Sequence, residues 1–290
     1  MRGDHWRGEA PTLLVTADDF GASRAVNEAV ERGHRHGILT CASLMVAGDA
    51  AADAVARAKA LPGLGVGLHL VLVEGRPTLP ARDVPDLVDG AARFRTNMAL
   101  AGVNFLRPQV RRQLDAEIGA QFDAFAATGL ALDHVNAHKH FHLHPMVAAL
   151  ILKHGRRHGL RAARAPVEPL ALLRAVEPVH VGLAGRIAAP YARSVARRFR
   201  RAGLAVPDRV LGLAWSGHMT PARVARLIDA LPPGVTELYL HPATVDDWPG
   251  HAPGYDYRGE LAALVGGDVR EAVGRRGARL AHFAELGGRE

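Results

Sequence analysis

The chain has 290 residues, of which 48% are hydrophobic, and a single cysteine, Cys41. One cysteine excludes internal disulfides and zinc sites built from several thiolates, and this length suits one large α/β domain or two smaller ones. The net charge of +7 is mostly arginine, and because no helix-turn-helix, zinc-finger or RNA-binding signature accompanies it, we attribute it to composition and expect no nucleic-acid partner.

The first predicted strand covers residues 12–16 and runs directly into Asp18 and Asp19. Successive side chains diverge, so one carboxylate is a candidate metal ligand and the other a candidate for handling a proton. The alternative is that an acid here caps the helix predicted for residues 23–32, because acidic groups favour a helix N-terminus. Two adjacent carboxylates exceed what a cap requires.

Further strands are predicted at residues 38–46 and 64–71, with a helix capped by Asp49 between them. The third strand carries His69 among apolar residues near its end. A lone histidine in that setting is usually a core residue, so its position on the sheet must decide between a core residue and a metal ligand. Residues 74–102 are rich in Pro, Gly and Asp, which predicts a long loop that acts as a lid or substrate wall.

A helix at residues 108–128 and a strand at 130–135 deliver a histidine cluster made of His134, His138, His140, His142 and His144. Imidazole binds zinc, nickel and iron, and it also serves as an acid or base near neutral pH. In an extended segment the last four would lie on one side, because side chains alternate with period two. A polar, solvated loop is the alternative.

The second half of the chain continues the alternation. It contains helices at residues 145–158, 191–201, 220–232, 258–265 and 268–275, and strands at 160–165, 209–215, 235–240 and 278–283. This order predicts a parallel sheet with right-handed crossovers, either closed as a (β/α) barrel or open. We expect a single barrel domain over residues 12–284, with flexible termini at 1–11 and 285–290.

The candidate residues share one place in this pattern. Asp18, Asp19, His69, His138 and His241 all lie at the C-terminal ends of predicted strands. Barrel enzymes build their active sites at that face. The convergence makes His69 a candidate ligand rather than a core residue.

These residues also carry a family resemblance. The motifs Thr-Ala-Asp-Asp-Phe-Gly, Gly-Leu-His-Leu, Asp-His-Val-Asn-Ala-His-Lys-His-Phe-His-Leu-His-Pro and Leu-Tyr-Leu-His-Pro, in this order, resemble the YdjC-like carbohydrate deacetylases, which include chitooligosaccharide deacetylase. The resemblance runs from residue 12 to residue 264. Residues 37–80 and the Asn-Ala-His-Lys-His-Phe-His stretch are most similar to the hopanoid-biosynthesis-associated branch, which is thought to deacetylate an N-acetylglucosaminyl hopanoid lipid.

The resemblance implies a distorted TIM-like (β/α) barrel, a homodimer and one divalent metal ion. By position, the metal ligands are Asp19, His69 and His138, the proton-handling acid is Asp18, and His241 is the histidine of the late His-Pro motif. This ligand set suits Zn²⁺, Co²⁺ or Ni²⁺, and relatives hold Mg²⁺.

Three further residues of the histidine cluster have less specific roles. His140 and His142 are candidates for orienting the ligands or touching the substrate. Lys139 is a third candidate, and it stands where chitooligosaccharide deacetylases tend to have a histidine, which puts the substrate in doubt rather than the metal site.

The expected function is metal-dependent removal of an acetyl group from an N-acetylated amino sugar, with the hopanoid lipid as substrate. Asp18 would take a proton from water, and His241 would protonate the departing sugar nitrogen. Deacetylation of soluble chitooligosaccharides, metal-dependent hydrolysis of another bond, and non-catalytic binding of a metal or sugar-lipid stay open as alternatives.

In the arginine-rich segment 191–201, Tyr191, Val195 and Phe199 share one stripe of a helix. It predicts either an outer barrel helix with this stripe packed inward, or a helix that rests on an anionic membrane surface. The first residues are charged and the apolar runs are too short to span a bilayer, so we expect a cytoplasmic protein in peripheral contact with the inner face of the membrane.

Overall fold

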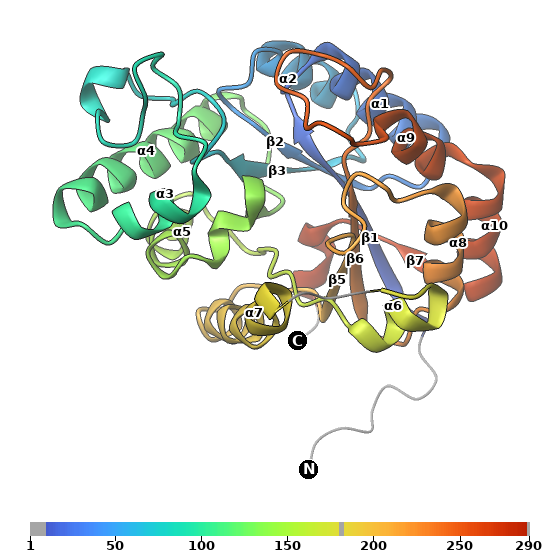
Figure 1. Cartoon of the computed structure of the whole chain (residues 1–290). Coiled ribbons are helices and arrows are strands. Elements are labelled where there is room, and N and C mark those ends of the chain that lie inside the picture. The colour runs from blue at the N-terminus through green and yellow to red at the C-terminus, as the bar shows by residue number, and fades with distance from the viewer. Residues whose placement is uncertain (1–9, 180–182, 289–290) are drawn as a thin grey trace.

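The structure, a computed structural model, describes residues 10–179 and 183–288. At its centre is a parallel sheet in the order β4-β3-β2-β1-β6-β5, with β7 pairing beside β1 (Figure 1). The strands are β1 Thr12–Phe20, β2 Cys41–Leu44, β3 Gly65–Leu70, β4 Val135–Ala137, β5 Arg209–Leu211, β6 Val235–Leu240 and β7 Arg279–Leu280. An α/β fold with a parallel sheet, as the alternating pattern predicted, is confirmed.

Helices surround this sheet (Figure 1). They are α1 Arg24–His36, α2 Ala51–Lys59, α3 Met98–Asn104, α4 Pro108–Ala127, α5 Pro145–Arg157, α6 Leu170–Val176, α7 Leu183–Arg201, α8 Pro221–Asp229, α9 Tyr257–Val265 and α10 Gly267–Arg276, with short 3-10 helices at Ala81–Asp83, His138–Leu143 and Phe283–Gly288. Among the described residues, no helix is both long enough and apolar enough to cross a membrane.

The sheet curves into a half-barrel rather than a regularly closed ring. The strand predicted at residues 160–165 is reduced to isolated parallel bridges, from Val135 to Ala163 and from Ala162 to Ala205. The first bridge joins the segment to β4, and the second joins it to Ala205, which precedes β5. Half of this segment is alanine, and the long side chain of Arg164 is fully buried in the interior.

Two local predictions are wrong. Asp49 does not cap α2, whose N-cap is Ala50 without a side-chain hydrogen bond; the Asp49 carboxylate instead lies 3.3 Å from Arg76 Nε. The strand predicted at 130–135 begins only at Val135 and ends at Ala137, although the Asp133 N–H still donates to Val66 O of β3.

The outer helix α7 matches its predicted stripe in part. Val195 and Phe199 are buried against the core, whereas Tyr191 is 41% exposed. The two buried residues pack as expected for an ordinary outer helix. Tyr191 lies on the surface, where it lines a hollow together with Val103 and Leu106.

Candidate active site

The structure brings all five strand-end residues together. Asp18, Asp19, His69, His138 and His241 line one cavity of about 340 Å³. Because β4, β3, β2, β1 and β6 are consecutive and parallel, their C-terminal ends open on the same side of the sheet. The sequence placed these residues on one face, and the sheet order makes them neighbours.

Three of them form a compact donor set. Asp19 Oδ1 lies 3.3 Å from His69 Nε2 and 3.1 Å from His138 Nδ1, and the three ligand atoms all lie within 4.8 Å of one another. Two imidazoles and a carboxylate that converge in this way fit one divalent transition-metal ion.

The backbone at Asp19 supports this reading. Its φ of +61° lies in the left-handed region that residues other than glycine rarely adopt. Such strain costs on the order of 1 kcal/mol and clusters at ligand and catalytic sites. The unusual backbone separates the carboxylate of Asp19 from that of Asp18, so that the two acids face different partners.

The charges of Asp19 and His138 within the donor set attract each other, and this attraction outweighs the effect of burial on both side chains. Burial opposes ionisation of Asp19, but the charge and hydrogen bond of His138 hold the pKa of this acid well below its usual range. In the same way Asp19 raises the pKa of His138 to about 9, against the effect of burial. A cation bound here would take the place of that imidazole proton.

Asp18 faces the interior and is held by Arg164. Arg164 donates hydrogen bonds from Nη1 and Nη2 to Asp18, the latter at 3.0 Å, and from Nε to Glu237 at 2.9 Å. Although burial opposes ionisation, the charge of Arg164 keeps the pKa of Asp18 well below its usual range. Asp18 is therefore a fixed carboxylate.

Arg164 is a site residue that the sequence interpretation missed. It is fully buried, and its guanidinium carbon lies 4.5 Å from the centroid of the Tyr239 ring. The available signal was an arginine among the alanines of the stretch predicted as a strand, where a long charged side chain that is buried needs a partner.

His241 borders the cavity between two tyrosines. Its ring centroid is 5.6 Å from that of Tyr239 and 5.3 Å from that of Tyr255. Its Nδ1 is buried without a hydrogen-bond partner among the described residues, and it lies 3.9 Å from Glu260 Oε2. An imidazole with one such nitrogen, at the edge of a cavity, is a candidate for proton transfer.

The histidine cluster does not form the extended segment that we predicted. Residues His138–Leu143 coil into a 3-10 helix in which Lys139 and His140 have φ values of +51° and +56°. The turn allows the Ala137 N–H to donate to His142 Nδ1 at 3.1 Å. Because of this bend, the histidines do not lie on one side of an extended segment.

As a result, the remaining members of the cluster have separate partners. His140 Nε2 lies 3.1 Å from the Tyr239 hydroxyl, and His144 accepts from the Met146 N–H at the start of α5. Burial lowers the pKa of His140 to about 3. Lys139 Nζ lies 3.3 Å from a Glu74 carboxylate oxygen. Of these histidines, His138 alone joins the donor set with Asp19 and His69.

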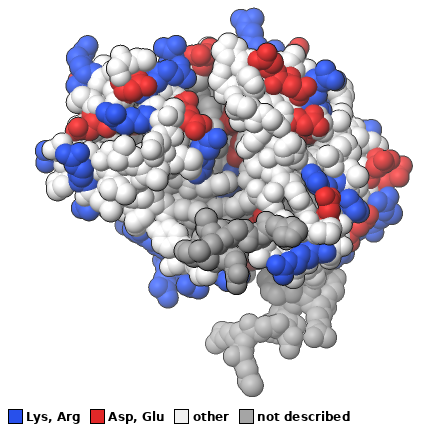
Figure 2. Space-filling view, in the orientation of Figure 1, with Lys and Arg blue, Asp and Glu red and all other residues white. Residues whose placement is uncertain are grey.

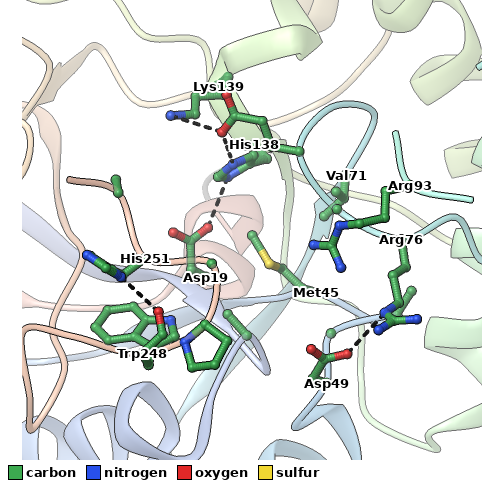
Figure 3. A pocket seen from close by; sticks show the side chains of 18 of the residues that line it. Asp19, Met45, Asp49, Val71, Arg76, Arg93, His138, Lys139, Trp248 and His251 are labelled. Carbon is green, nitrogen blue, oxygen red and sulfur yellow. Dashed lines mark hydrogen bonds and ion pairs between the residues drawn. The ribbon is translucent and has the colours of Figure 1, made fainter. Parts of the chain in front are cut away.

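The donor set also opens into a second cavity of about 340 Å³ (Figure 3). Trp248 and His251 lie on one side of Asp19 and His138, and Arg76 and Arg93 lie on the other. Met45 and Val71 line the space between. An aromatic wall opposite polar groups is suited to a sugar ring, which has apolar faces and hydroxyl edges.

A third hollow is apolar and adjoins the first. It has a volume of about 640 Å³ and lies between α3, α7 and the 3-10 helix, and Met98, Lys139 and His140 line both spaces. Its exposed apolar residues include Met98, Val103, Leu106 and Tyr191. We call the hollow lined by these residues the apolar groove. Figure 2 shows one face of the molecule, which is hollowed near its centre.

A protein-family model described as YdjC-like protein matches residues 12–275. The chain belongs to the YdjC-like family. The predicted family is thereby confirmed, whereas its hopanoid-associated branch stays a prediction.

Curated YdjC-like relatives carry deacetylase names. The chain is 31% identical over 277 residues to a carbohydrate deacetylase of Geobacillus stearothermophilus, covering 94% of this chain and 97% of that protein. It is 25% identical over 283 residues to a chitooligosaccharide deacetylase of Proteus mirabilis, covering 96% and 99%. A carbohydrate deacetylase of Brevibacillus brevis is 43% identical over 141 residues, and this match spans 54% of that protein.

A solved structure shares the fold. The crystal structure of a candidate cellobiose-phosphate cleavage protein from Enterococcus faecalis V583 has a TM-score of 0.77 and 23% sequence identity, and the match covers 96% of this chain and 99% of that one. At this identity the likeness supports the fold alone.

Proposed function

We propose that this chain is a metal-dependent deacetylase that removes the acetyl group from an N-acetylated amino sugar. The observation that carries the proposal is the convergence of Asp19, His69 and His138 as a donor set beside Asp18 and His241. Its relatives named carbohydrate and chitooligosaccharide deacetylases support the reaction class. Two nitrogen donors favour Zn²⁺, with Co²⁺, Ni²⁺ and Mg²⁺ as alternatives.

A divalent ion held by the donor set would acidify a water molecule and polarise the acetyl carbonyl. The protein supplies the proton transfers. Asp18, kept ionised and oriented by Arg164, accepts the proton of the attacking water. His241 delivers a proton to the sugar nitrogen as the amide C–N bond breaks, because an amine leaves readily only after protonation.

The apolar groove supports a lipid-linked substrate, such as the N-acetylglucosaminyl hopanoid expected from the sequence. It adjoins the cavity of Asp18 and His241, so an acetylated sugar in that cavity would direct an apolar aglycone along α3 and Tyr191. The second candidate is a soluble chitooligosaccharide, which the cavity beside Trp248 favours. The complete barrel, the homodimer and the cytoplasmic location stay predictions.

Acetate release from N-acetylglucosaminyl lipid and from chitobiose, measured side by side with the metal-loaded protein, tests both substrates. If the substrate is lipid-linked, the double variant Val103→Ser, Leu106→Ser should release acetate more slowly from the lipid and hydrolyse chitobiose at an unchanged rate. Val245→Ser, at another exposed apolar position, is the matched control and should affect neither. Equal rates of the groove variant and the control on the lipid would leave the soluble sugar as the substrate.

Variants of the two proton-handling residues separate an enzyme from a binding protein. Asp18→Asn should retain stoichiometric metal and lose nearly all turnover, because an amide accepts no proton from water. His241→Ala should lose less rate on an activated ester, whose leaving group needs no protonation, than on the amide. Full turnover in both variants would refute these proton-transfer roles, whereas a native chain that binds the metal and releases no acetate would leave the non-catalytic alternative.

A further inference from the structure

We infer that Asp133, His134 and Ser43 form a positioning chain that fixes the orientation of Asn136 and, through it, the tautomer of the candidate ligand His69. None of these four lines the cavity of the proposed site. The inference rests on the proposed metal site, since it concerns how a ligand is prepared for the ion. It assigns a role to His134, a member of the histidine cluster that lies outside the donor set.

The chain of hydrogen bonds is continuous. Asp133 Oδ2 lies 2.9 Å from His134 Nδ1, and His134 Nε2 lies 3.0 Å from Ser43 Oγ. Asn136 Nδ2 donates to Ser43 Oγ at 2.9 Å. Its amide oxygen hydrogen-bonds to His69 Nδ1. Asp133, His134, Ser43 and Asn136 are all buried.

The donor and acceptor of each hydrogen bond can be assigned by starting from Asp133, at the outer end of the positioning chain. The N–H groups of Phe283 and Ala284 donate to Asp133, at 3.2 and 2.8 Å. Against the effect of burial, the hydrogen bonds of His134 and His282 hold the pKa of Asp133 well below its usual range. A carboxylate only accepts, so His134 donates from Nδ1 and its Nε2 is an acceptor.

The remaining directions follow. Ser43 has one hydroxyl proton, and because Asn136 Nδ2 can only donate to it, that proton goes to His134 Nε2. The second Nδ2 hydrogen of Asn136 goes to Asp18 Oδ1 at 3.2 Å. This leaves the amide oxygen facing His69, which donates from Nδ1. His69 Nε2 then keeps its lone pair, and this is the atom 3.3 Å from Asp19 Oδ1.

The strand that carries His69 makes room for this chain. A Cβ on Gly67 would lie 2.5 Å from the His134 ring, and one on Gly65 would lie 2.8 Å from the Asp133 carboxylate. On its other side the His134 ring stacks on Phe283, with centroids 4.2 Å apart. The imidazole is thus confined in a slot between the glycines of β3 and the ring of Phe283.

The test reads the tautomer of His69 directly, in metal-free protein, from ¹⁵N NMR shifts of its imidazole nitrogens. The native chain should show one tautomer with the proton on Nδ1. Ser43→Ala, which removes a single oxygen, and His134→Leu should each give a mixture. His154→Leu is the matched control. His154 is also buried and lies 2.7 Å from a carboxylate, that of Asp115, but it belongs to α5 and takes no part in the positioning chain.

Zinc titration by calorimetry gives the second readout. Ser43→Ala should weaken zinc binding by about tenfold, as losses of orienting partners do, and His154→Leu should bind as the native chain does. A single unchanged His69 tautomer in Ser43→Ala and His134→Leu overturns the positioning chain, even where zinc binds. A native chain that binds no zinc overturns the proposed function instead, and the tautomer result still decides the inference. Ser43→Ala keeps the test valid if His134→Leu does not fold.

Discussion

Replacing Arg164 with methionine should destabilise the whole fold and not the site alone. The guanidinium is buried between Asp18 and Glu237, to which it donates four hydrogen bonds. Methionine has a comparable volume, so the cavity term is small and the loss is electrostatic. The variant leaves two buried carboxylates without their cation.

The size of the loss follows from what these carboxylates can do. A carboxyl group of ordinary pKa near 4 must take up a proton at pH 7 to become neutral, at a cost of about 4 kcal/mol. Thr16 still donates to Glu237 at 2.8 Å, and Asn136 to Asp18 at 3.2 Å, which limits the penalty. Breaking one partner from a buried ion pair typically costs about 3–5 kcal/mol. We therefore expect a loss in this range, a large part of the stability of an ordinary domain.

Urea denaturation followed by circular dichroism at pH 7 measures this loss as a change in the free energy of unfolding. The matched control is Arg275→Met, because Arg275 also makes two bonds to one aspartate, Asp229, but its side chain is 54% exposed. That surface pair should contribute at most about 1 kcal/mol. If Arg164→Met loses no more than Arg275→Met, the two buried carboxylates have found other partners and the reasoning is wrong.

Three other predictions concern metal, pH and membrane. Zinc at about 100 times its dissociation constant should stabilise the native chain by about 2.7 kcal/mol in thermal unfolding and leave His69→Ala unchanged; equal stabilisation would place the ion elsewhere. The hydrogen bond to Asp133 raises the pKa of His282 above 6.5. His282→Gln should therefore lower the free energy of unfolding most below pH 6.5, and this loss should fade as pH rises through the raised pKa. A loss that grows with pH in urea unfolding contradicts this assignment. In co-sedimentation, anionic vesicles should bind the native chain at low salt and release it at high salt; the membrane interpretation of α7 fails if the native chain sediments like a variant with glutamine at Arg197, Arg198, Arg200 and Arg201.

The sequence by itself determined the order of elements and most of the candidate site. Apolar periodicity and turn residues are local signals, so they predicted β6 at the same residues that the structure shows and α4 to within one residue. A parallel sheet sends every strand's C-terminal end to one face. That geometric rule was enough to group Asp18, Asp19, His69 and His241 before any contact was known.

Only the tertiary structure decided which polar groups meet inside that face. Arg164 and Asp18 are 146 residues apart, and Ser43 and His134 are 91 residues apart, so no local pattern links them. The left-handed backbone at Lys139 and His140, which brings His142 to the buried Ala137 N–H and His140 to the Tyr239 hydroxyl, is likewise not visible in any local pattern. The predicted strand 160–165 is reduced to isolated bridges, and the burial of Arg164 within it depends on partners that no strand propensity reveals.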